Sequence, residues 1–225
     1  RRWLAFEAQQ PDRLLLVDGE PGASVFGNET YYLEAALRLA VAGQNAPLTP
    51  YEPVRLALSG PQSLPDLSEY RVVMLCNVAA LSAADSSRLD RYVAAGGRLL
   101  VFAGAKLQPE GYAALQEAGL MPATIGIQAD PASYRMQTWD KEHPIFRPLS
   151  DPQQGDLRRL VFRRIVRMKA NSEAKVLAAT DGGDPLLVEK SRGRGTVLLF
   201  AAAADRQWGD WPQSRLYVPL VHQVL

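Results

Sequence analysis

The sequence predicts an α/β domain with a doubly wound, mostly parallel sheet and an antiparallel, β-rich C-terminal part. Two observations support this fold class. Apolar runs of strand length alternate with amphipathic helical patterns over the first half of the chain. One run, residues 98–104, is apolar on both faces, which is typical of a strand in a parallel sheet that helices cover on either side. After Met121, short strands, prolines and turns replace this alternation.

The N-terminal part contains one clear strand and one weak strand. Residues 13–18, RLLLVD, form an apolar run that ends in the loop DGEPG, and a helical pattern begins near Asn28. Gly43 is a suitable C-terminal residue for that helix. Residues 52–58 alternate roughly between apolar and polar side chains, which predicts a strand at an edge of the sheet.

The strongest unit covers residues 71–104. It begins with the strand RVVMLCN, continues with a helix that Ser82 and Asp85 open as a capping box, and ends with the strand RLLVFAG. Gly96 and Gly97 end the helix. Strand, helix and strand in this order predict a βαβ crossover between parallel strands.

The second half is predicted to be rich in β-structure. After a helix at 109–118, residues 174–180 and 185–190 form strands across a DGGD turn. A Gly-Arg-Gly turn then leads into the strand TVLLFAAA. The apolar pattern of residues 219–225 predicts the start of a last helix.

These elements predict one domain over residues 1–225. Residues 1–12 are expected to be the tail of a preceding region, and 121–195 a β-rich insertion or edge. The chain opens with RRWLAF, without an initiator methionine, and stops within an apolar pattern. It is therefore expected to be an excised piece of a larger protein.

Composition narrows the class of protein. Of the 225 residues, 47% are hydrophobic and 22% charged, which indicates a globular domain with a large core. A formal net charge of +1 supplies no overall field for nucleic acid, so no nucleic-acid partner is predicted. Cys76 has no second cysteine to pair with and lies in an apolar run, which favours a buried core position. No apolar run reaches the roughly 18 residues that a membrane span needs.

Several segments together resemble the class I glutamine amidotransferase-like, flavodoxin-like domain of bacterial Bat-type (aerotolerance-associated) membrane proteins. The segments are LLLVDGEP, VVMLCNVAALS, YVAAGGRLLVFAG, HPIF, DPLLVEKSRGRGTVLLFAAAADRQW and YVPLVHQ. The resemblance implies a membrane-anchored parent with a von Willebrand A-like region, whose other domains would be partners of this one. It also implies an extracytoplasmic location.

The residues that class I amidotransferases need are missing. Those enzymes place a cysteine on a sharp turn after a central strand, with a histidine as its base. The matching turn here is residues 103–106, AGAK, and the later strand end reads AAD at 203–205. The chain is therefore predicted to be a non-catalytic interaction or ligand-sensing domain that uses no cofactor. His143 and His222 lack metal-ligand spacing, so no metal site is predicted.

A ligand site in a parallel sheet is expected at the carboxyl ends of the strands. The polar candidates there are Asp18, Glu20, Asn77, Lys106 and Asp205. The identity of a small-molecule ligand is left open. The alternative function is a hydrolase-type enzyme that uses Asp18, Glu20 or Asp205 as a general base. The competing structural interpretation is that these side chains satisfy the backbone of turns.

Two features are candidates for a partner surface. Residues 157–169 carry a basic cluster around an apolar row that fits either a helix or a strand. This cluster consists of Arg158, Arg159, Arg163, Arg164, Arg167 and Lys169. It is either a solvated face or a contact for an acidic protein or anionic lipid headgroups. Trp208 and Trp211, on an expected loop, either pack locally or anchor a partner.

Overall fold

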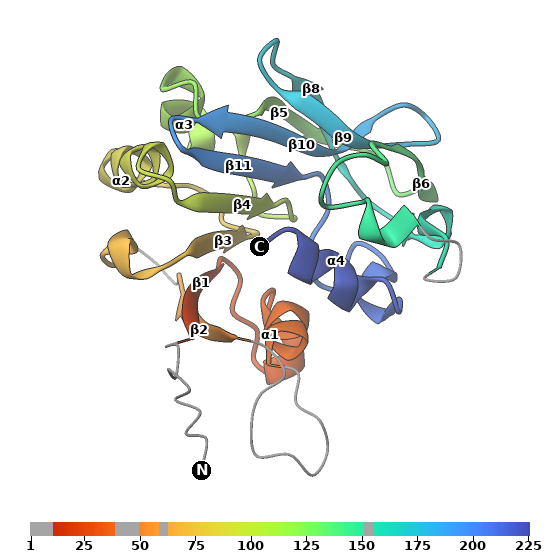
Figure 1. Ribbon diagram of the computed structural model, residues 1–225, viewed down its shortest axis with the longest axis horizontal. Helices are drawn as coiled ribbons and strands as arrows, with labels where there is room; N and C mark the ends of the chain where they lie inside the picture. Colours follow the sequence, from red (N-terminus) through yellow and green to blue (C-terminus); the bar gives the residue numbers. More distant parts are fainter. Residues whose placement is uncertain (1–10, 39–49, 59–62, 151–154) are drawn as a thin grey trace, which may run out of the picture.

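A nine-stranded mixed sheet organises the chain (Figure 1). The computed structural model describes residues 11–38, 50–58, 63–150 and 155–225. In this part of the chain the strand order of the large sheet is β2-β1-β3-β4-β11-β10-β9-β6-β7, and β5 and β8 form a separate two-stranded sheet. The expected helix end at Gly43 and most of the expected N-terminal tail lie outside the described residues.

One half of the large sheet is parallel. Its strands are β1 (Asp12–Asp18), β2 (Tyr51–Ala57), β3 (Val72–Cys76), β4 (Arg98–Phe102) and β11 (Gly195–Phe200). Every residue of β3 is buried, as expected for a strand with parallel neighbours on both sides. The strands predicted at 13–18, in RVVMLCN and in RLLVFAG are confirmed, and the weak strand at 52–58 is the edge strand β2.

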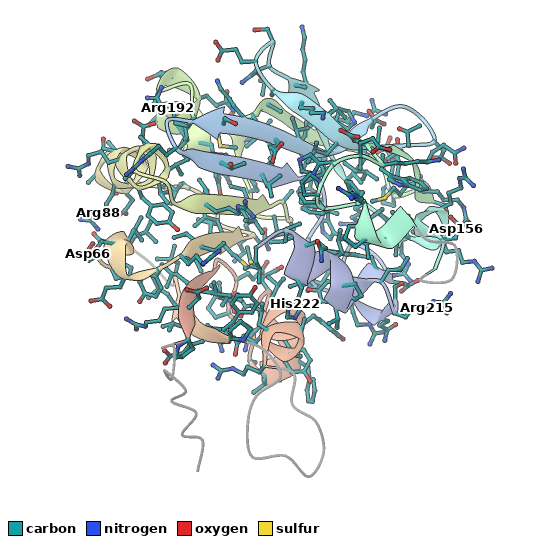
Figure 2. The ribbon with its side chains drawn as sticks, viewed as in Figure 1. Asp66, Arg88, Asp156, Arg192, Arg215 and His222 are labelled. Atoms are coloured by element: carbon teal, nitrogen blue, oxygen red, sulfur yellow. The ribbon has the colours of Figure 1, made fainter. Side chains whose placement is uncertain are left out.

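The helices connect and cover these strands. They are α1 (Tyr31–Leu37), α2 (Ala83–Ala94), α3 (Ala113–Glu117) and α4 (Tyr217–Gln223). Ser82 caps α2 as predicted, because its Oγ accepts the Asp85 N–H at 3.0 Å. α1 and α4 lie side by side, and the His222 Nε2 of α4 lies 3.0 Å from the Ala36 carbonyl of α1 (Figure 2).

Short 3₁₀ turns complete the helical structure. They are η1 (Val25–Gly27), η2 (Leu67–Glu69), η3 (Pro109–Tyr112), η4 (Pro148–Ser150), η5 (Leu157–Arg159) and η6 (Trp211–Gln213). The helix predicted at 109–118 consists of η3 followed directly by α3, so its first turn is tighter than an α-helix.

The other half of the large sheet is antiparallel. Its strands, and those of the small sheet, are β5 (Ala123–Gln128), β6 (Tyr134–Trp139), β7 (Val161–Phe162), β8 (Val166–Ala170), β9 (Lys175–Thr180) and β10 (Pro185–Arg192). β9 and β10 are the hairpin predicted across the DGGD turn. Gly183 has a φ of 85° in that turn, a conformation that strongly favours glycine.

The predicted fold class, a flavodoxin-like doubly wound sheet, is wrong. Within the nine-stranded sheet of the described residues, β11 is the last parallel strand, and every pairing from β10 to β7 is antiparallel. Residues 157–169 form no α-helix; they consist of the 3₁₀ turn η5 followed by β7 and most of β8. Their β-branched residues, such as Val161 and Val166, fit a pleated surface better than a helix.

An aromatic cluster around Trp211 contacts both halves of the sheet, because the Trp211 ring centre lies 6.4 Å from that of Phe102 in β4 and 6.1 Å from that of Phe162 in β7. The Trp211 ring lies 5.5 Å from that of Phe200 and 4.7 Å from that of Tyr217, and its Nε1 donates to the Ala203 carbonyl at 2.9 Å. Trp211 is 1% exposed and Trp208 is 2% exposed. The prediction that these two tryptophans form part of a partner surface is therefore wrong, because both belong to the core.

Replacing Trp211 tests this assignment. Trp211→Ala removes a fully buried ring and leaves the Ala203 carbonyl without its donor, so we expect a loss of about 3–5 kcal/mol in the free energy of unfolding. Phe26→Ala is the matched control, because Phe26 is 71% exposed, and its effect should stay within about 0.5 kcal/mol. Urea denaturation measures both, and equal effects would contradict the assignment.

Candidate functional site

The side chain of Asn77 holds together three loops at the carboxyl ends of the strands. Asn77 follows β3 directly, is 1% exposed and has a φ of 52°, a left-handed conformation that asparagine tolerates better than most residues. Its Nδ2 donates to Glu20 Oε2 at 3.0 Å and to Glu29 Oε1 at 2.7 Å. Its Oδ1 accepts the backbone N–H of Lys106 at 2.8 Å. Both the nitrogen and the oxygen of this amide therefore form hydrogen bonds that connect the three loops, and we call this meeting point the junction.

Two glycines make room for Asn77. A Cβ on Gly104, which follows β4, would overlap the Asn77 side chain. A Cβ on Gly19, which follows β1, would overlap the Asn77 backbone carbonyl. The turn at 103–106, which matches the nucleophile turn of class I amidotransferases, is thus shaped to approach Asn77 and carries no cysteine. Cys76 is buried, and burial raises the pKa of its thiol well above the usual value.

Three buried carboxyl groups surround this junction. Asp18, Glu29 and Asp205 are 0%, 1% and 4% exposed. Burial raises the pKa of all three, and for Glu29 burial together with the nearby Asp205 charge raises the pKa to about 8. In the part of the chain that the structure describes, Asp18 Oδ2 and Glu29 Oε2 are buried without a hydrogen-bond partner. Glu29 is therefore a neutral carboxylic acid at neutral pH.

Two cations lie over the acids. Arg55 Nε is 3.3 Å from Asp18 Oδ2, and Lys106 Nζ is 3.4 Å from Glu20 Oε1. The Glu20 and Lys106 side chains are 36% and 51% exposed, whereas Glu29 beneath them is buried. The site thus has a solvent-facing ion pair above a protonated acid.

The structure brings together the residues predicted at the strand ends. Glu20, Asn77 and Lys106 contact one another directly, and the charge of Asp18 and that of Asp205 both act on Glu29. The turn-satisfying interpretation also has support, because Asp18 Oδ1 accepts the Glu20 N–H at 3.2 Å and Asp205 Oδ1 accepts the Gln207 N–H at 3.0 Å. These bonds occupy one oxygen of each carboxyl group.

Sequence reasoning missed Glu29. It follows Asn28, whose Oδ1 accepts the Gly22 N–H at 3.0 Å and so folds the loop after β1 back over the strand ends. The only sequence signal was the polar triplet Asn28, Glu29 and Thr30 ahead of α1, where carboxylates are common and usually solvated. Its burial depends on this loop, which no local pattern describes.

The histidines and the acids show no arrangement for a metal. In the described ranges, no group of three or more His, Cys, Asp or Glu side chains is placed to hold one. His143 Nε2 lies 3.1 Å from Glu189 Oε2, and His143 Nδ1 accepts the Ile145 N–H at 3.3 Å. His143 is therefore a bonded turn residue away from the strand-end cluster.

The basic cluster is exposed but partly neutralised. Arg163 Nη2 donates to both carboxylate oxygens of Asp210, at 2.6 and 2.7 Å, and the Arg158 guanidinium lies 5.7 Å from the centre of the Trp139 ring. Arg167 Nε is 4.0 Å from Asp184 Oδ1. The cluster extends over η5, the segment after β7, and β8. Its role as a partner surface stays a prediction.

Solved structures match nearly the whole chain, whereas no family model and no curated protein does. Cytoplasmic protein STM3548 from Salmonella typhimurium is 19% identical, with a TM-score of 0.66, over 94% of this chain and 96% of that one. Cytoplasmic protein STM1381 from Salmonella typhimurium LT2 is 19% identical, with a TM-score of 0.67, over 94% and 99%. A β-galactosidase from Bacillus circulans sp. alkalophilus is 17% identical, with a TM-score of 0.62, over 96% of this chain. This chain spans only 30% of that galactosidase, and at these identities the likeness establishes the fold alone.

These matches correct three predictions. The resemblance to the amidotransferase-like domain of Bat-type membrane proteins is contradicted, because the matching structures are cytoplasmic proteins and a glycosidase. The extracytoplasmic, membrane-associated location falls for the same reason. The inference that the chain is not an enzyme is also overturned, because its fold occurs within a β-galactosidase. The missing cysteine and histidine argue only against the glutamine amidotransferase reaction.

None of the described helices has both the length and the apolar character that crossing a bilayer requires.

The raised pKa of Glu29 predicts a pH-dependent stability. Its carboxyl group titrates near 4.5 in the unfolded chain and near 8 in the fold, so the folded state keeps a proton that the unfolded state releases. The stabilising difference is present below pH 4.5 and disappears as the pH rises to about 8. Glu29→Gln cannot ionise and should become more stable than the native protein as the pH rises, by several kcal/mol at pH 8.

Urea denaturation between pH 5 and pH 9 measures this difference. Glu117→Gln, which changes an exposed residue at the end of α3, should follow the native curve. A constant difference between Glu29→Gln and the native protein across this range would contradict the assignment.

Proposed function

We propose that the protein is a hydrolase whose acid–base chemistry is carried by the carboxyl groups at the strand ends, with Glu29 as general acid and Glu20 as general base or nucleophile. One observation supports this most directly. Asn77 Nδ2 binds both carboxyl groups at once, one beneath the surface with a pKa of about 8 and the other in an ion pair at the surface. Carboxyl groups held in such different environments are typical of acid–base pairs.

Glu29 has the properties of a proton donor. At neutral pH it is mainly protonated, because burial and the Asp205 charge raise its pKa. Its Oε1 accepts from Asn77, so the proton belongs on Oε2, which has no hydrogen-bond partner among the residues that the structure describes. A general acid works best when its pKa lies near the working pH.

Glu20 has the properties of the charged partner. Its Oε1 faces Lys106 and its Oε2 accepts from Asn77, so both carboxylate oxygens are held in place. The Glu20 and Glu29 oxygens lie 3.0 and 2.7 Å from the same nitrogen and cannot be farther apart than the sum of these distances. Carboxyl pairs about 5–5.5 Å apart are typical of glycosidases that retain the anomeric configuration, whereas inverting enzymes need about 6.5–9.5 Å.

Glycosides are the substrate class that we propose. The support is this carboxyl separation together with the fold shared with a β-galactosidase, of which the chain spans 30%. Glu29 is 1% exposed, so proton delivery to a substrate requires the loop after β1 to shift. That loop ends in η1, where Val25 and Phe26 are 65% and 71% exposed and the Phe26 ring lies edge to face against Tyr31.

Kinetics of the two carboxyl variants test the proposal. The purified protein is assayed against a panel of nitrophenyl glycosides, with rates measured from pH 4 to pH 10. We expect turnover that falls roughly a hundredfold or more in Glu29→Gln and in Glu20→Gln, and that stays unchanged in Glu117→Gln. The native rate should decline as the pH rises past 8, where Glu29 loses its proton. No turnover of any glycoside, or turnover that survives in Glu29→Gln, would overturn the proposal.

The stereochemistry of the product tests the carboxyl separation. If Glu20 attacks the sugar as a nucleophile, two displacements occur and the first product keeps the anomeric configuration of the substrate. Proton NMR of the first sugar released distinguishes the anomers before they equilibrate. Inversion would mean that another pair, farther apart than Glu20 and Glu29, carries the reaction.

A further inference from the structure

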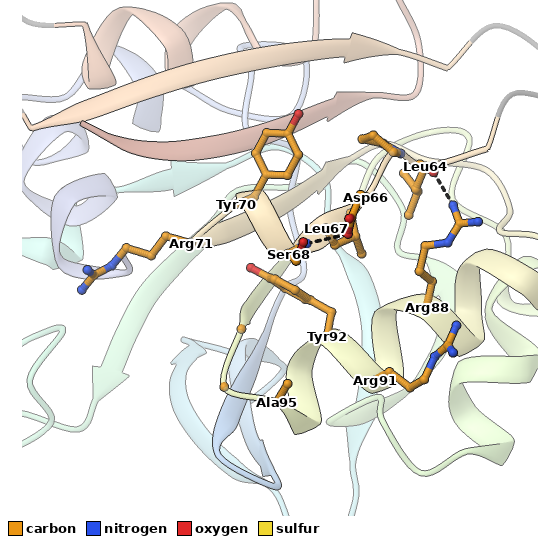
Figure 3. Close-up of a pocket in the computed structure, with 13 residues that line it drawn as sticks. Leu64, Asp66, Leu67, Ser68, Tyr70, Arg71, Arg88, Arg91, Tyr92 and Ala95 are labelled. Atoms are coloured by element: carbon orange, nitrogen blue, oxygen red, sulfur yellow. Dashed lines mark hydrogen bonds between the residues drawn. The ribbon is translucent and has the colours of Figure 1, made fainter. Parts of the chain in front are cut away.

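A cavity lies at the amino ends of the parallel strands, opposite the strand-end carboxyl cluster (Figure 3). Its volume is about 860 Å³, and it is lined by residues that precede β3 and β4, whereas Asn77 follows β3. A volume of this size lies within the range of about 300–1,000 Å³ that small-molecule sites occupy. The cavity therefore shares no residue with the strand-end carboxyl cluster.

One face of α2 forms a wall of the cavity. Arg88, Arg91, Tyr92 and Ala95 recur at helical spacing and line it together. Figure 3 shows Arg88 reaching toward Leu64 and the Tyr92 ring lying close to Ser68. The opposite wall is the segment around η2, with buried Leu64 and Leu67. The cavity thus has an apolar floor beneath a basic rim.

The lining carries more positive than negative charge. It contains three arginines and one carboxylate, Asp66, which accepts the Ser68 N–H at 3.0 Å. Arg71 pairs with Asp12 at 3.0 Å. Arg88 Nη1 donates to the Leu64 carbonyl and lies 3.4 Å from Asp85 Oδ1. These bonds fix the position of Arg88 and engage one of its three nitrogens.

Arg91 is the cation that the fold leaves available. Its Nε donates to the Ser87 carbonyl at 3.3 Å, and within the described ranges it forms no ion pair. The last carbonyl groups of α2 do not offset the charge of Arg91, because they are already bonded to Arg194. The Arg194 Nη2 donates to the Ala95 carbonyl at 2.7 Å, and the Arg194 N–H donates to the Ala94 carbonyl at 3.2 Å. Arg88 and Arg91 lie about one helical turn apart in α2, and both line the cavity.

We propose that this cavity binds a small phosphorylated molecule. The phosphate binds Arg88 and Arg91, whose planar donor groups match phosphate oxygens, and the organic part lies against Leu67 and the Tyr92 ring. The alternative is a solvated helix face with no ligand, and the experiment below separates the two.

Binding of phenyl phosphate tests the proposal. NMR titration of the native chain compares phenyl phosphate with inorganic phosphate and with phenol. We expect phenyl phosphate to bind best and phenol not to bind at millimolar concentration, with shifts confined to residues 64–71 and 88–97. Arg91→Gln should weaken binding of phenyl phosphate about tenfold without affecting folding, because Arg91 is exposed. Arg88→Gln should weaken it at least as much.

Arg215→Gln is the matched control, because Arg215 is an exposed arginine on the other side of the molecule (Figure 2). Equal weakening by Arg215→Gln and Arg91→Gln would show general charge attraction and overturn the site. Shifts at Asn77 in place of α2, or no binding of either phosphate, would overturn it as well. Glu29→Gln should bind phenyl phosphate like the native chain, so the result does not depend on the proposed hydrolysis.

Discussion

The amide of Asn77 is the interaction on which the strand-end region depends. Its three hydrogen bonds at the junction connect the loops after β1, β3 and β4, and two of them hold the carboxyl groups of Glu20 and Glu29. A buried amide with full partners is stabilising, whereas the same group with one partner removed costs the desolvation of what remains. Gly19 and Gly104 follow from this constraint, because no side chain fits beside it.

A near-neutral composition conceals two regions of different charge. The carboxyl ends of the parallel strands combine the acids Asp18, Glu20 and Asp205 with the cations Arg55 and Lys106, and the amino ends carry the arginines of α2. The formal net charge of +1 is a sum over the whole chain and does not describe the charge of either region. Local fields of this kind decide which ligand approaches which edge, since surface charges are screened beyond about 10 Å.

Local signals in the sequence predicted the parallel half well and the rest poorly. The Ser82 cap and the buried run of β3 depend on neighbours in sequence, and both are found in the structure. The DGGD turn predicted the antiparallel hairpin of β9 and β10, but no local pattern indicated that β6 and β7 extend it within the same sheet, so the sheet was predicted to be mostly parallel. The burial of Glu29 and of Trp211 comes from loops that fold back over the sheet, which periodicity does not report.

The position of β11 has a consequence for how the chain folds during synthesis. β11 (Gly195–Phe200) fills the place beside β4 (Arg98–Phe102), although it is made long after its neighbour. Translation adds roughly 5–20 residues per second, so β4 waits for seconds with one edge unpaired. Such an edge recruits other strands and favours aggregation. A product truncated before β11 would leave the β4 edge unpaired permanently. Addition of β11 is therefore the step that protects the new sheet from pairing with other copies of the same chain.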